Sequence, residues 1–167
     1  MRRRSRGPRS SAPVSCRHAG GAHVARRRKT AERREASGQG IVLDAGALLA
    51  LERRPIRLLA ELGRAYELGL PVRIPAGALA QAWRGGPRSA SIARLLAQPC
   101  VVVEMHERAA KDIGELIAGL GAPRGGKPDV VDAHVALTAR ATQSLVWTSD
   151  PDDLARYGVP PELVRAL

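Results

Sequence analysis

The residues of this sequence that could do chemistry are chiefly aspartates at the ends of short apolar segments. Asp44 follows residues 41–43 (IVL), and Asp150 follows residues 144–148 (SLVWT). Both segments have the length and composition of buried strands, and a parallel sheet would bring the two carboxylates to the same edge. Carboxylates gathered without a cation repel one another, whereas a hard divalent ion such as Mg²⁺ prefers oxygen ligands. The pattern therefore predicts a metal site that could activate water for attack on a phosphoryl group.

Each candidate aspartate also has a structural alternative. Asp44 could only cap the following helix, and Asp150 could only form a turn. Asp129 and Asp132 have the spacing of a variant capping box, so spacing alone leaves both interpretations open. The functional interpretation depends on their joint arrangement at one sheet edge. Two further aspartates, for which we favour a role in complementing a helix dipole, are Asp152 and Asp153.

Alternating apolar strands and helices must position these aspartates. Strands are expected at residues 41–43, 71–74, 100–104 and 144–148, with a last strand or turn at the end of the chain. Helices are expected at residues 47–53, 56–68, 76–84, 89–97, 106–120 and 129–141, with a short one from 151 to 157. Ser89 is expected to cap the helix that it begins. Strands joined by helices predict an α/β fold with a central, mostly parallel sheet of four to five strands and helices on both faces.

Charge divides the chain into two parts. Residues 1–40 hold twelve of the 27 Lys and Arg residues and two of the 16 Asp and Glu residues. Because this segment has few large apolar residues, we expect a disordered extension, whose basic run at residues 26–29 could bind RNA or an acidic partner. An extension without a function is the stronger alternative. The folded domain is expected to comprise residues 41–167, which carry a net charge of only +1.

Targeting and cysteine patterns favour a cytoplasmic protein that does not enter a membrane. No apolar segment of adequate length follows the early arginines, and no run approaches the roughly 18 apolar residues of a membrane span. The spacing of Cys16 and Cys100 suggests neither zinc nor a disulfide framework.

Three segments together resemble the PIN domain family, and most closely its VapC-like toxins. Residues 41–48 (IVLDAGAL) resemble the opening of PIN domains, and residues 132–136 (DAHVA) resemble the start of their last long helix. Residues 146–150 (VWTSD) resemble their late strand with its Thr and Asp. The likeness covers nearly all of residues 41–167 in the right order and spacing. It implies a PIN-like three-layer α/β/α sandwich and a Mg²⁺-dependent ribonuclease, with Mn²⁺ as a substitute ion.

The resemblance also implies roles for individual residues. Asp44 and Asp132 would be the main metal ligands, and Asp150 would complete the cluster directly or through water. Thr148 would orient the cluster through its hydroxyl, and Asp129 would support it. The family further implies a cognate antitoxin protein that holds the enzyme inactive, and a homodimer or larger assembly. RNA, including tRNA or another structured RNA, is the implied substrate.

One position departs from the family pattern. Gln81 stands where the family usually has a glutamate in the helix after the second strand. A glutamine keeps one oxygen that can bind a metal but loses a negative charge, so metal affinity should fall. An alternative hypothesis is therefore a catalytically weakened or inactive PIN-like module that binds RNA or protein.

Basic and aromatic residues add weaker expectations. Arg84, Arg88 and Lys127, with Arg124, lie near the expected site and could bind an RNA backbone, although a solvated surface is the usual case. Both tryptophans are expected in the core, and His134 is expected to be packed or exposed rather than a general base. Receiver domains and haloacid-dehalogenase-type phosphatases, which also place an aspartate after the first strand, are rejected because their other residues are missing.

Overall fold

The computed structural model of the chain describes residues 39–120 and 128–167. The expected disorder of residues 1–40 concerns positions that, apart from the last two, lie outside the described residues. Gly40 is buried, and its carbonyl accepts a 2.9 Å hydrogen bond from the Leu145 N–H. The expected RNA contact Lys127, like Arg124, also lies outside them.

Five parallel strands form one sheet in the order β3-β2-β1-β4-β5. The strands are β1 (Ile41–Leu43), β2 (Val72–Pro75), β3 (Cys100–Val103), β4 (Leu145–Thr148) and β5 (Val164–Ala166). The prediction of an α/β fold with a parallel sheet is confirmed, and the chain end forms a strand rather than a turn. β1 is central and wholly buried, as an apolar strand between two neighbours and two helical layers must be.

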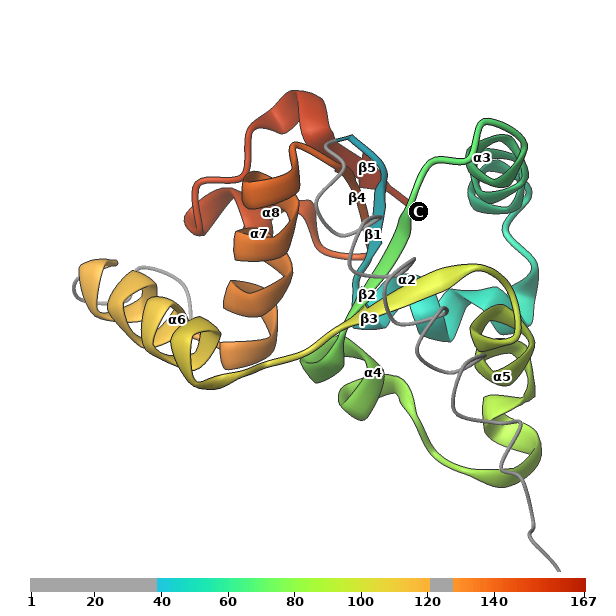
Figure 1. Ribbon diagram of the computed structural model, residues 1–167, viewed down its shortest axis with the longest axis horizontal. Helices are drawn as coiled ribbons and strands as arrows, with labels where there is room; N and C mark the ends of the chain where they lie inside the picture. The colour runs from blue at the N-terminus through green and yellow to red at the C-terminus, as the bar shows by residue number, and fades with distance from the viewer. Residues whose placement is uncertain (1–38, 121–127) are drawn as a thin grey trace, which may run out of the picture.

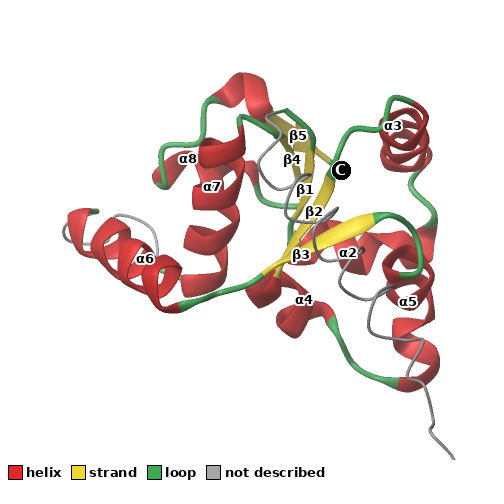
Figure 2. Cartoon of the chain, viewed as in Figure 1, coloured by secondary structure: helices red, strands yellow, loops and turns green. Residues whose placement is uncertain are grey.

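The described helices follow the expected ranges closely (Figure 2). They are α2 (Ala45–Ala50), α3 (Ile56–Glu67), α4 (Ala76–Ala82), α5 (Ala90–Leu96), α6 (Glu107–Gly119), α7 (Val130–Thr142) and α8 (Pro151–Arg156), with 3₁₀ turns at Leu51–Arg53, Gly86–Ser89 and Pro161–Leu163. The expectation that Ser89 caps α5 is wrong. Its hydroxyl instead accepts hydrogen bonds from the N–H groups of Arg84 and Gly85, at 2.9 and 3.0 Å.

Helices cover both faces of the sheet and create a reversal in the strand order. Figure 1 shows α6, α7 and α8 on one side of the sheet and α3 and α5 on the other. The chain runs outward from β1 to β2 and β3, then returns through α6 and α7 to β4, on the other side of β1. The carboxyl ends of β1 and β4 therefore flank a topological switch point, where open α/β sheets form their binding crevices.

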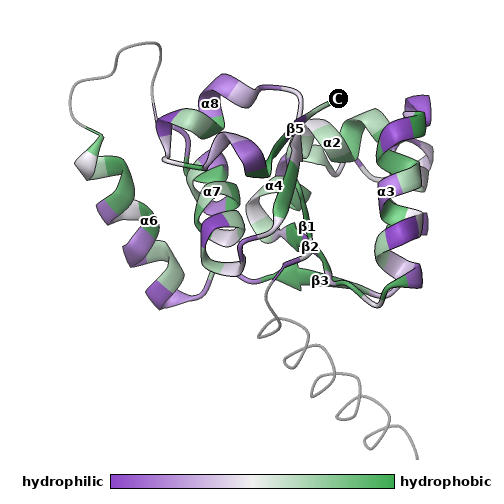
Figure 3. Ribbon diagram, turned by 90° about the horizontal axis from the view of Figure 1, so that it is seen from above, coloured by the Kyte–Doolittle hydropathy of each residue, from purple (hydrophilic) through white to green (hydrophobic). Residues whose placement is uncertain are grey.

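The core lies around α7 and the central strands. α7 packs against β1, β2, β4, α4 and α6, and the strands form the apolar interior in Figure 3. Trp147 on β4 is only 4% exposed, as expected of a core residue. The same expectation for Trp83 is wrong, because this residue ends α4 in an extended conformation and is 42% exposed.

Candidate metal centre

Asp44 lies at the carboxyl end of β1 and is only 8% exposed. Its N–H continues the ladder by donating to the Trp147 carbonyl of β4 at 3.1 Å. Its carboxylate caps α2 by accepting a hydrogen bond from the Ala45 N–H. The carboxylate also accepts a hydrogen bond from the Thr148 hydroxyl at 2.7 Å. Burial raises the pKa of Asp44 in spite of these hydrogen bonds. The carboxylate is therefore both a helix cap and a member of the sheet edge.

Thr148 links the ends of β1 and β4 through one hydroxyl. It donates to Oδ2 of Asp44 and accepts from the N–H of Asp150 at 2.9 Å. Asp150 in turn caps α8 by accepting from the Asp153 N–H at 3.4 Å, so its structural role is that of a helix cap. Its charge also contributes to the raised pKa of Asp44, which places the two carboxylates in one electrostatic environment.

Asp132, in the first turn of α7, is where the carboxylates converge. The pKa of Asp132 is raised to about 6, first by burial and then by the negative charges of Asp129, Asp44, Asp153 and Asp150, in that order. Ion pairs of the described residues join Arg108 to Asp112, Lys111 to Glu107 and Arg156 to Asp153. The last of these pairs brings a guanidinium to Asp153, one of the four acids whose charges raise the pKa of Asp132.

Only one of the two hydrogen bonds of a capping box is present at Asp129 and Asp132, whose spacing left that interpretation open. Asp129 caps α7 by accepting from the Val131 N–H at 2.6 Å. The Asp129 N–H, which a capping box would satisfy through Asp132, instead donates to the Tyr157 hydroxyl at 2.7 Å. This hydroxyl donates to the Asp129 carbonyl at 3.1 Å. Tyr157 therefore takes the contact that Asp132 would make in a complete capping box.

Asp153 belongs to the same electrostatic environment, although we favoured a purely structural role for it. It pairs with Arg156 at 3.5 Å, and its charge still raises the pKa of Asp132. Its position in the first turn of a helix that starts at the acidic edge was the signal in the sequence. Asp152 is exposed in that turn, in keeping with the expected dipole role.

Gly46 allows the two strand ends to approach each other. A Cβ atom at position 46 would collide with the Ser149 hydroxyl and would lie 2.9 Å from the Ser149 Cβ. Real Cβ atoms essentially never approach so closely. The glycine between Asp44 and the rest of α2 is thus required by a contact with the segment between Thr148 and Asp150.

Gln81 lies on the exposed side of α4, a helix that packs between α2 and α7. Gly77 is one turn earlier on the same side, and a Cβ there would lie 3.4 Å from the Val131 side chain in the first turn of α7. Gln81 therefore lies one helical turn beyond the contact with the start of α7, where it is exposed and adds no negative charge. Arg84 and Arg88 are exposed beyond the end of the helix.

His134 is packed inside the domain. It is 2% exposed, and neither ring nitrogen has a hydrogen-bond partner among the described residues. Burial lowers the pKa of His134, with a smaller contribution from His106. A neutral, buried imidazole without a partner agrees with one of the two expected placements.

A divalent cation would fit the chemistry of these donors. They are oxygen atoms of partly buried carboxylates whose mutual repulsion such an ion would relieve. In the described part of the chain, no three Asp, Glu, His or Cys side chains come close enough to bind one ion directly. An ion such as Mg²⁺, which keeps several of its waters, would need few direct carboxylate ligands.

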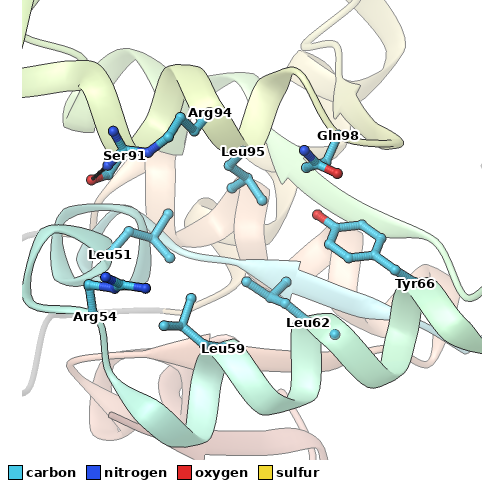
Figure 4. A pocket seen from close by; sticks show the side chains of 10 residues that line it. Leu51, Arg54, Leu59, Leu62, Tyr66, Ser91, Arg94, Leu95 and Gln98 are labelled. Carbon is cyan, nitrogen blue, oxygen red and sulfur yellow. Dashed lines mark hydrogen bonds between the residues drawn. The ribbon is translucent and has the colours of Figure 1, made fainter.

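A cavity lies between α3 and α5 (Figure 4). It has a volume of about 590 Å³ and is lined by Leu51, Arg54, Leu59, Leu62, Gly63, Tyr66, Ser91, Arg94, Leu95 and Gln98. None of these residues is an acid, so the cavity offers a metal no carboxylate. Among the described helices, none has both the length and the apolar character needed to cross a membrane.

The fold and the acidic edge together define a three-layer α/β domain with carboxylates at its switch point. Residues 41–160 match the family model of the PIN domain. Among solved structures, a chain from the structure of FitAB bound to an IR36 DNA fragment matches this chain with a TM-score of 0.51 and 20% sequence identity. The match covers 75% of this chain and 94% of that chain, and at this identity it supports the fold alone. Comparison with curated proteins gave no match.

This chain belongs to the PIN domain family, since the family model covers most of its length. PIN domains are generally nucleases and typically use divalent metal ions. The matched region contains all the aspartates of the acidic edge.

Proposed function

We propose that this PIN domain is a ribonuclease that depends on a divalent cation, Mg²⁺ with Mn²⁺ as a substitute, and hydrolyses RNA phosphodiester bonds. The observation that carries the proposal is the raised pKa of Asp132. That value, about 6, arises where the start of α7 meets the ends of β1 and β4. Such a concentration of negative charge is costly for folding and suggests a functional site.

Each residue of the edge would have a separate task. Asp44 and Asp132 would hold the ion, and Asp150 would hold one of its waters. When bound, the ion would supply a water of lowered pKa and stabilise charge on the phosphoryl group. Thr148 keeps the Asp44 carboxylate in place through its 2.7 Å hydrogen bond, and Asp129 positions the turn that carries Asp132. Arg84, Arg88 and Lys127 would bind phosphates of the RNA.

We further propose that the chain is the toxin of a toxin–antitoxin pair and is held inactive by an antitoxin protein. The support is the resemblance of residues 41–48, 132–136 and 146–150 to VapC-like toxins. The solved neighbour adds support, because it is FitAB bound to a DNA fragment. A homodimer is part of this proposal.

Cleavage of RNA by the purified full-length chain tests the activity. A pool of total RNA and tRNA is incubated with Mg²⁺, with Mn²⁺ and with EDTA. Asp44→Asn and Asp132→Asn are compared with Asp112→Asn, at a half-buried aspartate of α6 that pairs with Arg108 at 3.1 Å. We expect discrete cleavage that needs the metal, falls at least about 100-fold in the first two variants and persists in the third. Cleavage that survives in EDTA or in both site variants would overturn the proposal.

A second candidate function is an inactive PIN module that binds RNA or protein. Gln81, which supplies no charge beside the start of α7, and the lack of three close acidic ligands among the described residues favour it. Folded protein, freed of any co-purified partner, that binds RNA without cleaving it would establish this reading.

A further inference from the structure

Trp83 exposes a large aromatic ring at the end of α4. Its N–H still donates to the Leu79 carbonyl at 2.8 Å, but its own backbone turns to an extended conformation with φ −71° and ψ 125°. The side chain is 42% exposed, whereas the other tryptophan, Trp147, is 4% exposed. An indole that could have been buried instead faces solvent, which marks it as a candidate contact residue.

The segment that follows is held in one shape. We call residues 83–88 (WRGGPR) the Trp83 loop. Gly85 and Gly86 have positive φ angles of 72° and 56°, which favour glycine. Ser89 is 1% exposed, and its hydroxyl accepts from two N–H groups of the loop, at 2.9 and 3.0 Å. A loop fixed in this way loses little conformational entropy when it binds a ligand.

The charge of the Trp83 loop is entirely positive. The Arg84 guanidinium donates to the Trp83 carbonyl at 3.1 Å, so it lies beside the aromatic residue. Arg88 follows in the next turn, and the loop contains no acidic residue. An exposed aromatic ring beside cations is the combination with which proteins bind single-stranded nucleic acid, because bases stack on the ring and phosphates meet the cations. A protein partner would not require the arginines.

The Trp83 loop continues directly from the helix beside the acidic edge. α4 packs against α2, which begins after Asp44, and against α7, which carries Asp132 (Figure 1). Gly77 on α4 lies against Val131, and Trp83 is six residues further along. Six residues of helix span about 9 Å. A strand bound at the carboxylates could therefore reach the ring with a neighbouring nucleotide.

We propose that Trp83 is a base-stacking subsite for an unpaired nucleotide of single-stranded RNA, with Arg84 and Arg88 binding the flanking phosphates. This inference rests on the proposed function and specifies the form of its substrate. It implies that RNA with an unpaired base near the scissile bond is preferred over a continuous duplex.

Tryptophan fluorescence of the full-length chain tests the subsite in EDTA, where no metal-dependent cleavage occurs. Three probes are compared: a single-stranded oligoribonucleotide, a blunt duplex of the same sequence, and inorganic polyphosphate, which has charge but no bases. We expect the oligoribonucleotide to quench the emission and to protect it from iodide, and the other two to do neither. Trp147 is buried and should not respond. Equal quenching by polyphosphate would overturn the inference.

Substitutions of Trp83 test base stacking, and a control substitution elsewhere tests for general effects on folding. Trp83→Ala should weaken oligoribonucleotide binding about 5-fold to 100-fold, and Trp83→Phe, which keeps a ring, should recover most of the affinity. Leu68→Ala, at a leucine 61% exposed at the end of α3, is the matched control and should bind normally. Unchanged affinity in Trp83→Ala would overturn the inference.

The readout separates this inference from the proposed function. Base-dependent quenching without cleavage in Mg²⁺ would leave the subsite in place and reject the nuclease. Cleavage in Mg²⁺ without base-dependent quenching would keep the nuclease and reject the subsite. Emission that instead changes with protein concentration alone, and no longer does so in Trp83→Ala, would assign the ring to contact between copies of the chain and overturn the inference.

Discussion

At the residue scale, Asp132 combines partial burial with four neighbouring negative charges. Its pKa is about 6 in the folded chain against 3.8 for an ordinary aspartate. Between these values the folded state holds a proton that the unfolded state has released. Stability therefore falls as the pH rises through this window and stays lower above about pH 6.

Asp132→Asn should therefore make the metal-free protein more stable at neutral pH. We expect the free energy of unfolding in EDTA at pH 7.5 to rise by about 1–2 kcal/mol, because the amide removes the repulsion. Urea denaturation at several pH values measures this, and the gain should shrink as the pH falls towards 4. A variant that is less stable at every pH would contradict the prediction.

Gln81 offers the reverse change, the addition of a charge beside the start of α7. Gln81→Glu should raise the affinity for Mg²⁺ or Mn²⁺ by about 5-fold, since one more carboxylate near the ion contributes about 1 kcal/mol in a solvated setting. Titration calorimetry without RNA measures it. Gln98→Glu, an exposed glutamine that lines the cavity between α3 and α5, is the matched control and should change nothing. Equal effects of the two substitutions would show that only overall charge matters.

At the element scale, the acidic edge depends on how closely the ends of β1 and β4 approach. The register pairs Leu43 with Trp147, and the Thr148 hydroxyl joins the residues that follow. Gly46 and Ser149 are in contact just beyond this link. The strand ends can therefore be pushed apart by adding a single methyl group at position 46.

Gly46→Ala should lower the free energy of unfolding by about 1–3 kcal/mol, as overpacking does, and should reduce cleavage more than RNA binding. Ser149→Gly in the same chain removes both side-chain atoms that collide with the new methyl group and should restore much of the loss. Thermal unfolding and cleavage rates of the two single variants and the double variant measure the coupling. Purely additive effects would refute a contact between the two positions.

At the scale of the whole molecule, charge and chemistry are separated along the chain. Residues 1–40 have a large excess of arginine, while the described aspartates lie within residues 41–167. Binding by many cations falls steeply with salt because it releases counterions from the nucleic acid. The RNA affinity of a nearly neutral domain that binds through a few residues depends on salt much less.

Deletion of residues 1–38 should therefore lower RNA affinity at 50 mM salt by about 10-fold or more and flatten the dependence of affinity on salt. Metal-dependent cleavage of RNA should remain. Fluorescence anisotropy at about 50 and 200 mM salt in EDTA, for the full chain and for residues 39–167, measures the two slopes. Equal slopes would show that the arginine-rich segment does not contact RNA.

Local sequence was sufficient to predict the elements and the edge at which the site forms. Apolar residues in short runs or at helical spacing report burial directly, so the segments at 41–43, 100–103 and 130–142 were expected within a residue or two. Alternation of strands and helices then requires a parallel sheet. That sheet brings the ends of β1 and β4, with Asp44 and Asp150, to the same edge.

Only the tertiary structure decided which polar groups meet at that edge. Tyr157, far from Asp129 in the chain, takes the hydrogen bond that a capping box would have given to Asp132. Asp153 joins the acidic edge, and Trp83 faces solvent although its apolar character suggested the core. Each outcome depends on contacts between segments that are distant in sequence. Spacing along the chain specifies which face of an element a residue occupies, whereas its hydrogen-bond partners and burial depend on what packs against that face.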